Sequence, residues 1–309
     1  MGIGNHACEA VSEIYYENEN PAIDFITITS NREVLRSFLI PSENKIYLTS
    51  DRKNNKKHES QSNSKHEPVG EGLVALEKLL TKNYQLIFIL TTLDGETGTA
   101  LSKMIAERSA QTDALIISII AYPYYLKGKL HHFNVESGLN ALSNFSDTLF
   151  LFSNDRSCLF QDLKETQNIP IPTHSLFMQP VEVILSMISL DGSINIDFND
   201  METAIKGTNK PAAILNGLGQ GKERIAQILT AMYQSPYLAE IEWSTLNTII
   251  ICFESGYENE IQVNEIAQVM DSFQNKFSAN PEFIWGNCTN PNLSGAIRVS
   301  AVLTQQQAE

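Results

Sequence analysis

The segment at residues 94–100, Asp-Gly-Glu-Thr-Gly-Thr-Ala, contains the small residues that an anion site needs. It follows an apolar run at 86–90 that predicts a buried strand, and it precedes a predicted helix at 101–108. Small side chains let backbone N–H groups approach a phosphate, and the start of a helix adds partial positive charge. No Gly-Lys-Ser/Thr follows, so this is not a Walker loop. The pattern predicts a phosphate cradle, although an ordinary strand-to-helix turn with threonine caps explains it equally well.

Two carboxylates three residues apart form a second candidate site. They are Asp197 and Asp200, in the segment Asn-Ile-Asp-Phe-Asn-Asp at 195–200. Paired carboxylates can carry acid–base chemistry. At the start of a helix they can also act only as caps, because Asp is a favourable N-cap and its charge suits the first turn. The residues alone leave both interpretations open.

Two further glycine-rich segments are weaker signals. Gly2-Ile3-Gly4 opens a predicted helix. Residues 216–223, Asn-Gly-Leu-Gly-Gln-Gly-Lys-Glu, superficially match a dinucleotide-binding Gly-x-Gly-x-x-Gly motif, but the third glycine is absent and no βαβ unit surrounds them. We interpret 216–223 as a flexible connector between a strand and a helix.

The histidines and cysteines indicate no metal site. The six histidines have no metal-binding spacing, and no nucleophile motif such as Gly-x-Ser-x-Gly occurs. The cysteines lie far apart without a Cys-x-x-Cys pair, which is typical of reduced thiols in a cytosolic protein. They are Cys8, Cys158, Cys252 and Cys288.

The composition bounds the class of protein. The chain has 309 residues, of which 42% are hydrophobic, so it can bury a sizeable core and is not wholly disordered. Its formal net charge of −14 disfavours nucleic-acid binding, because an acidic surface repels phosphate backbones. No apolar run reaches the ~18 residues that span a membrane. The N-terminus does not resemble a signal peptide, so we expect a cytoplasmic protein with no direct membrane insertion.

Strands and helices alternate in the first half of the chain, which predicts an α/β fold with a doubly wound, mostly parallel sheet. The expected strands are 23–29, 86–90, 114–120 and 148–152. The expected helices are 7–16, 73–80, 101–108 and 135–142. Residues 49–67 contain no apolar residue, so we expect a long mobile loop there.

A long apolar helix at 177–190 is expected to be a central spine, and mixed strands and helices after it predict a smaller α+β second domain. The expected strands there are 212–216, 248–253, 282–286 and 296–304, and the expected helices are 223–233 and 263–277. The predicted organisation is an α/β domain at 1–176, a connecting helix at 177–192, the second domain at 193–304 and a tail at 305–309.

The order of these segments resembles the FtsZ family, the bacterial relatives of tubulin, over almost the whole chain. In the first domain, the matching segments are residues 2–11 for the glycine-rich first loop and helix, 24–31 for the next strand and its Asn-Thr-Asp turn, and 94–100 for the tubulin signature loop. They continue with 123–128 for a Lys-Pro-Phe-type turn and 147–155 for a strand ending in Pro-Asn-Asp. After these come 195–200 for the synergy loop, and 217–224, 235–238, 290–293 and 297–299 for the second domain, all in family order.

The resemblance implies a GTPase of bacterial cell division that polymerises head to tail with itself or with another FtsZ-family subunit. Asp197 and Asp200 of one subunit would place a water against the γ-phosphate of GTP bound by the next. GTP or GDP, with Mg²⁺, would bind the first domain at Gly2, Gly4, Gly95, Thr97, Gly98, Thr99 and Asn154.

Departures from the family pattern favour an alternative. The signature loop has Asp94, Glu96 and Ala100 where the family has glycine, and carboxylates close to a triphosphate weaken its binding. The positions on the ribose and guanine sides are altered as well, and no strand is expected before the first loop. The alternative is a degenerate paralogue that binds no GTP and modulates a true FtsZ filament.

Overall fold

The computed structural model describes residues 1–17, 20–48, 71–93, 96–122, 129–153, 173–241, 243–276 and 281–305. The loop expected at 49–67 lies outside these residues. The chain forms two compact units. Unit 1 comprises Met1–Ser146 and Ser153–Met178, and unit 2 comprises Asp147–Phe152 and Gln179–Glu309.

Unit 1 contains a parallel sheet in the strand order β3-β2-β1-β4-β5. Its strands are β1 (Gly2–Ile3), β2 (Thr27–Thr29), β3 (Lys45–Tyr47), β4 (Leu86–Thr92) and β5 (Leu115–Tyr122). β4 and β5 are largely buried runs of Leu, Ile and Phe, as expected for parallel strands covered on both faces. The predicted α/β fold with a doubly wound sheet is confirmed.

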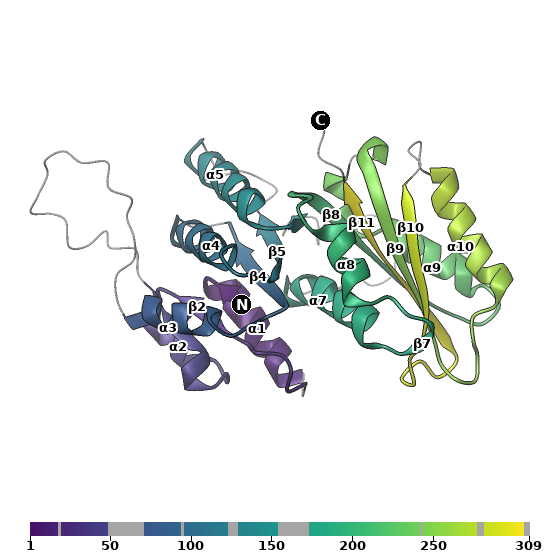
Figure 1. Cartoon of the computed structure of the whole chain (residues 1–309), viewed down its shortest axis with the longest axis horizontal. Helices are drawn as coiled ribbons and strands as arrows, with labels where there is room; N and C mark the ends of the chain where they lie inside the picture. Colours follow the sequence, from purple (N-terminus) through teal and green to yellow (C-terminus); the bar gives the residue numbers. More distant parts are fainter. Residues whose placement is uncertain are drawn as a thin grey trace, which may run out of the picture. The chain divides into compact units, whose positions relative to one another are not determined.

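Helices connect these parallel strands (Figure 1). They are α1 (Asn5–Glu17), α2 (Arg32–Ser37), α3 (Glu71–Leu80), α4 (Glu96–Ser109) and α5 (Lys129–Phe145), with a 3₁₀ turn at Ser42–Asn44. Ala7, Val11 and Ile14 of α1 are buried at helical spacing, so one stripe of this helix enters the core. α1, α2 and α4 begin shortly after the ends of β1, β2 and β4, respectively, so their N-termini lie at the carboxyl edge of this parallel sheet.

The first strands differ from the prediction in two ways. The strand expected at 23–29 is limited to β2, because β2 pairs with β1 and β3 only over Thr27–Thr29. A strand also precedes the first loop, contrary to expectation. Gly2 and Ile3 form β1, which pairs with β2 on one side and β4 on the other.

Unit 2 contains a mixed sheet in the strand order β6-β8-β11-β9-β10-β7. Its strands are β6 (Thr148–Ser153), β7 (Gly192–Ile194), β8 (Lys210–Gln220), β9 (Leu246–Ser255), β10 (Glu282–Thr289) and β11 (Ala296–Gln305). β8 and β9 both pair antiparallel with β11, whereas β9 and β10 run parallel. This is the mixed α+β arrangement predicted for the second half.

The helices after β6 are α7 (Thr173–Ser189), α8 (Phe198–Ile205), α9 (Arg224–Tyr233) and α10 (Val263–Lys276), with 3₁₀ turns at Pro236–Glu240 and Trp243–Thr245. α7 is the predicted apolar helix, and it begins in unit 1 and ends in unit 2. α8 and α10 lie on opposite sides of the strands of unit 2 (Figure 1).

The interpretation of 216–223 as a flexible connector was wrong, because strand β8 continues through Gln220. Its glycines serve close packing. A Cβ atom on Gly217 would lie 2.5 Å from the carbonyl oxygen of Ile228, and one on Gly219 would clash with the carbonyl oxygen of Arg224. Glycine therefore lets α9 lie directly against the strand.

Candidate functional site

The sheet of unit 1 has a switch point between β1 and β4. From β1 the chain continues to β2 and β3 on one side, whereas β4 is followed by β5 on the other side. The connections leave the two neighbouring strands in opposite directions, and in open α/β sheets a crevice forms outside the carboxyl ends of such strands. Ligands of open α/β sheets bind at this position.

Two helices begin at this switch point. Gly4 follows β1 and directly precedes α1, while Gly98 lies in the first turn of α4. Among the described residues, a Cβ atom on Gly4 would have the Cα of Gly98 as its neighbour, at 4.0 Å, so the two helix starts approach each other. Gly4 has a φ of 85°, a conformation that L side chains rarely adopt. The first N–H groups of a helix lack partners within it, so this edge can bind an anion.

Buried hydroxyl groups hold α4 on the sheet below this edge. The side-chain oxygens of Thr91 and Ser102 lie 2.6 Å apart, and the Ser102 hydroxyl donates to the carbonyl oxygen of Gly98 at 2.7 Å. Neither residue was predicted as part of the site. The sequence shows only that Thr91 ends an apolar strand, and this does not indicate that its hydroxyl contacts Ser102.

A second polar contact fixes the start of α1. The hydroxyl of Thr29, the last residue of β2, donates to Oδ1 of Asn5 at 2.8 Å. The same hydroxyl oxygen accepts from the backbone N–H of Asn31 at 3.2 Å. Asn31 in turn caps α2 by accepting from the backbone N–H groups of Glu33 and Val34. The carboxyl ends of β1 and β2 are therefore linked to two helix starts.

The remaining residues predicted for the nucleotide have different positions. Gly2 is a packing residue, since a Cβ there would lie 2.5 Å from the carbonyl oxygen of Ala7 in α1. The methyl group of Thr99 faces Gly138 of α5. Thr97 belongs to the first turn of α4. Gly95 and Asn154 lie outside the described residues.

In unit 2, Asp197 and Asp200 form a reciprocal capping box at the start of α8. Oδ1 of Asp197 accepts from the backbone N–H of Asp200, and Oδ2 of Asp200 accepts from the backbone N–H of Asp197, both at 2.9 Å. The two residues therefore act as caps, as one of the two interpretations expected, and their catalytic role stays a prediction. Among the described residues neither carboxylate makes a second hydrogen bond, so each keeps one oxygen for another partner. Asp197 is exposed and Asp200 is half-buried.

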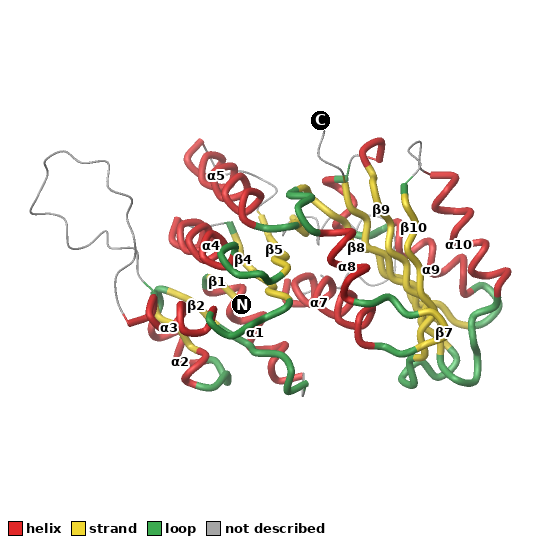
Figure 2. The backbone as a smooth tube through the Cα atoms, in the orientation of Figure 1, coloured by secondary structure: helices red, strands yellow, loops and turns green. Residues whose placement is uncertain are grey.

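The loop that carries these carboxylates runs from β7 to α8 (Figure 2), and contacts within unit 2 hold it on both sides of residue 195. Ile196 is 2% exposed, and Gly286 of β10 makes room for it, because a Cβ there would lie 2.8 Å from Cγ1 of Ile196. Met201, five residues later, is also buried, as in a hydrophobic staple. The backbone N–H of Gly192 donates to Oδ1 of Asn195 at 2.7 Å. The loop thus has one defined conformation.

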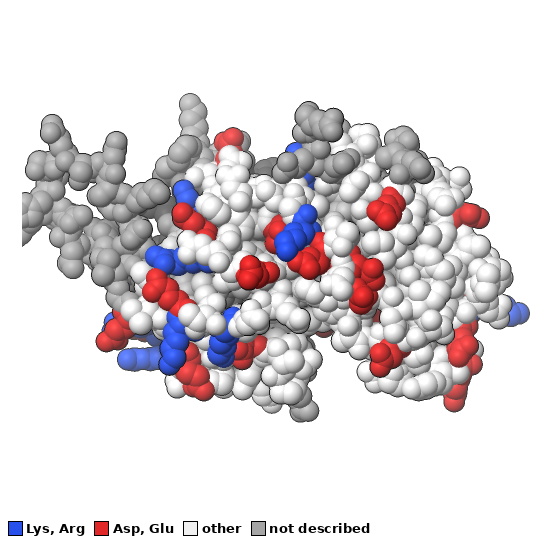
Figure 3. Space-filling view, in the orientation of Figure 1, with Lys and Arg blue, Asp and Glu red and all other residues white. Residues whose placement is uncertain are grey.

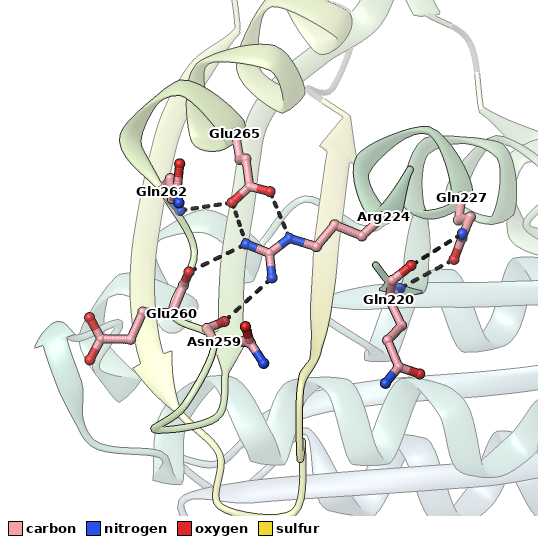
Figure 4. Close-up of polar contacts among 7 residues, drawn as sticks. All are labelled: Gln220, Arg224, Gln227, Asn259, Glu260, Gln262 and Glu265. Atoms are coloured by element: carbon pink, nitrogen blue, oxygen red, sulfur yellow. Dashed lines mark hydrogen bonds and ion pairs between the residues drawn. The ribbon is translucent and has the colours of Figure 1, made fainter. Parts of the chain in front are cut away.

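Arg224 forms a separate polar cluster in unit 2 (Figure 4). Its Nε and one terminal nitrogen donate to the two carboxylate oxygens of Glu265, both at 2.6 Å. Its terminal nitrogens also donate to the carbonyl oxygens of Asn259 and Glu260. The hydrogen bonds from Arg224 hold the pKa of Glu265 below its ordinary value. Through these contacts Arg224 joins α9 to α10 within unit 2.

Charged side chains of both signs share one face of the molecule. On the face drawn in Figure 3, Lys and Arg side chains are scattered among Asp and Glu and form no continuous basic stripe. In the described part of the chain, no three His, Cys, Asp or Glu side chains are grouped as a metal site would need. No helix within it combines the length and hydrophobicity needed to cross a bilayer.

Comparison with known proteins supports the same architecture. Residues 2–159 match the model of the tubulin/FtsZ family GTPase domain, and residues 211–307 match that of the FtsZ family C-terminal domain. The chain is 24% identical to cell division protein FtsZ 1 of Archaeoglobus fulgidus over 98% of this chain and 80% of that protein. It is 27% identical to cell division protein FtsZ 1 of Methanocaldococcus jannaschii over 75% of this chain and 62% of that protein.

The fold is also that of a solved FtsZ structure. The empty FtsZ dimer of M. jannaschii superposes with a TM-score of 0.72 and 20% sequence identity, covering 99% of this chain and 87% of that chain. The family model of the GTPase domain alone spans more than half of the 309 residues. The chain therefore belongs to the tubulin/FtsZ family, as a divergent FtsZ-type member.

Proposed function

We propose that this protein is an FtsZ-type GTPase of cell division that assembles head to tail and hydrolyses GTP between subunits. The observation that carries the proposal is the meeting of two helix starts, at Gly4 and Gly98, at the switch point of a GTPase-family sheet. The two relatives named above are archaeal, so the bacterial setting expected from the resemblance stays a prediction.

The residues at this edge fit a phosphate group. Gly4 has a left-handed backbone, and the direction its Cβ would take has no atom of the described residues closer than 4.0 Å. The helix starts of α1 and α4 offer backbone N–H groups and partial positive charge. Bound Mg²⁺ would offset part of the phosphate charge. The buried hydroxyls of Thr91 and Ser102 keep α4 in place, so these N–H groups are positioned before the nucleotide binds.

Asp197 and Asp200 supply the second half of the proposed site. The capping box uses one oxygen of each carboxylate, and the other oxygens can orient a water for attack on the γ-phosphate of GTP held by the neighbouring subunit. Phosphoryl transfer depends mainly on positioning and electrostatic stabilisation, so a fixed pair of carboxylates is sufficient for this role.

Turnover measured against protein concentration tests the proposal. If each site is completed by a second subunit, phosphate release per subunit at saturating GTP and Mg²⁺ rises with protein concentration and reaches a plateau. ATP in place of GTP is the control for base specificity. A rate per subunit that does not depend on concentration would show that one subunit is sufficient, and it would contradict the proposed assembly.

A second candidate function rests on the altered signature loop. Asp94, Glu96 and Ala100 replace glycines of the family pattern, which disfavours a triphosphate nearby. A chain with this loop could instead bind a true FtsZ subunit through the 195–200 loop without binding GTP. A stoichiometric complex with an active FtsZ, together with no detectable GTP binding, would favour this second function.

A further inference from the structure

Glu254 is a carboxylate in the core of unit 2 with no part in the site described above. It lies on β9 and is fully buried. Its Oε2 accepts from the side-chain amide of Asn290 at 2.8 Å and lies 3.5 Å from a guanidinium nitrogen of Arg298. Its Oε1 lies 3.3 Å from the hydroxyl of Ser186, whose single proton is shared between this carboxylate and the carbonyl oxygen of Val183 in the same helix, at 3.0 Å. One carboxylate thus joins α7, β9, β11 and the turn between β10 and β11.

A buried carboxylate is a poor choice for stability alone. Removing a charge from water is unfavourable, and well-packed apolar residues in place of a buried ion pair are often as stable or more stable. Hydrogen bonds to a buried charge have strict geometry, however, so they select one arrangement of the elements that supply them. The chemistry of Glu254 is therefore better suited to fixing a position than to stabilising the core.

The elements that Glu254 joins are those that hold the 195–200 loop. Ser186 lies near the end of α7, which leads through Asp191 into β7. The backbone N–H of Thr289, next to Asn290, donates to the carbonyl oxygen of Asp191 at 2.9 Å. β7 pairs with β10, with Gly192 opposite Cys288. The chain entering the loop is therefore held between α7 and the end of β10, and Glu254 contacts both.

We propose that Glu254 is a positioning residue for Asp197 and Asp200. Its hydrogen bonds to Ser186 and Asn290 set the end of α7 against the end of β10, and this contact fixes the path of residues 191–197 into the capping box. The inference about the loop stands on unit 2 alone. Its consequence for hydrolysis rests on the proposed GTPase function.

Hydrogen–deuterium exchange of Glu254→Gln measures the positional effect without nucleotide. We expect the backbone N–H groups of Asp197 and Asp200 to exchange about tenfold faster than in the wild type, because the loop opens more often, whereas amides of β8 keep their protection. Glu282→Gln is the matched control, since it makes the same chemical change at an exposed position of β10. Unchanged exchange at Asp197 and Asp200 would overturn the proposal.

Two further variants keep the test decisive if Glu254→Gln folds poorly. Ser186→Ala removes only one hydroxyl and is expected to accelerate exchange of the same loop. The double variant Glu254→Gln with Asn290→Asp exchanges acid and amide across a 2.8 Å hydrogen bond, so a carboxylate remains near Arg298. We expect it to restore slow exchange. Normal protection in Ser186→Ala, or a double variant that folds without restoring protection, would show that Glu254 only fills space.

The turnover number separates this inference from the proposed function. Where the wild type hydrolyses GTP, Glu254→Gln is expected to lower kcat by about ten- to a hundredfold with unchanged GTP affinity, because it displaces Asp197 and Asp200 but leaves unit 1 intact. The acid–amide exchange should recover kcat. If the wild type shows no hydrolysis, the proposed function fails, while the exchange experiment still decides whether Glu254 positions the loop.

Discussion

The two candidate half-sites, the edge of unit 1 at Gly4 and Gly98 and the 195–200 loop of unit 2, are built from different chemical groups. At the edge of unit 1, the groups that would meet a ligand are backbone N–H groups next to Gly4 and Gly98, and buried hydroxyls support them from below. In the 195–200 loop of unit 2, the groups are carboxylate side chains, and Asp197 and Asp200 hold each other through the capping box.

From this difference we expect the two half-sites to tolerate sequence change differently. An anion site made of backbone N–H groups needs conformation and space more than particular side chains, so its sequence can diverge while the two helix starts remain in place. A carboxylate pair needs the acids themselves. The retained Asp197 and Asp200 and the altered signature loop are therefore compatible with one function.

Removing charge from the carboxylate pair should have the largest effect. Asp197→Asn with Asp200→Asn keeps oxygens that can accept the capping hydrogen bonds but removes both charges. We expect GTP turnover to fall about 10²- to 10³-fold, as for the loss of a catalytic acid or base, with little change in the melting temperature. Asn199→Ala in the same loop is the control. A double variant with normal phosphate release would leave Asp197 and Asp200 as caps only.

Breaking the Arg224–Glu265 pair should have the largest effect on stability. The two side chains are 11% and 15% exposed, so Arg224→Met leaves a largely buried carboxylate without its partner. We expect unit 2 to lose about 2 kcal/mol of unfolding free energy in urea denaturation. Lys222→Met removes the same charge from an exposed position and should change little. Equal effects of the two variants would contradict the structural role of the pair.

The Arg224–Glu265 pair also predicts how the stability of unit 2 depends on pH. The hydrogen bonds from Arg224 lower the pKa of Glu265, so the stability it contributes is present above the unfolded-state pKa and is lost as pH falls through the lower folded-state pKa. The unfolding free energy that Glu265→Gln loses relative to the wild type should therefore be largest at pH 7 and decrease below pH about 4. A deficit that stays constant into this acid range would argue against the ion pair.

Alanine variants of two glycines with positive φ distinguish the effect of backbone strain on stability from an effect on nucleotide binding. Gly4 has φ 85° in unit 1, and Gly207 has φ 69° in unit 2, where a Cβ would meet no atom within 4 Å in the part of the chain that the structure describes. Alanine at either position should lower the unfolding free energy by about 1–2 kcal/mol. Only Gly4→Ala should also weaken GTP binding, by about tenfold, because its Cβ enters the proposed anion site. Equal nucleotide affinity in both variants would move that site away from Gly4.

An exposed ion pair in unit 1 should have the smallest effect. Lys82 donates to Asp24 at 2.7 Å and lowers the pKa of that carboxyl, but the two side chains are 54% and 35% exposed. Solvent screens such a pair, so Lys82→Met should change the unfolding free energy by less than about 0.5 kcal/mol. A larger change would mean that this end of unit 1 depends on electrostatics more than its exposure indicates.

Much of the fold could be predicted because long elements carry periodic patterns. The apolar runs of β4 and β5 and the amphipathic spacing of α1 each identify one element without reference to the rest of the chain. The two-residue strand β1 has no pattern of its own, and only its neighbours β2 and β4 make it a strand. The glycines of β8 were misinterpreted because the sequence predicts the helix α9 but not its close contact with the strand, which only the three-dimensional structure shows.

The candidate site could be predicted only where its motif is local. Asp197 and Asp200 are three residues apart, so their capping box is a local feature that spacing alone indicated. The contact between Thr91 and Ser102 joins a strand to a helix, and that between Glu254 and Asn290 spans 36 residues. Such contacts depend on how the strands pair, which no single segment determines.

Calorimetric titration with GTP in the presence of Mg²⁺ tests the central claim most directly. The two helix starts at the switch point predict saturable binding at micromolar GTP, with weaker or no binding of ATP. Absence of binding up to about 1 mM GTP, which corresponds to less than about 4 kcal/mol, would contradict a nucleotide site in unit 1. The 195–200 loop would then be the part of this protein that acts, through a partner that binds GTP itself.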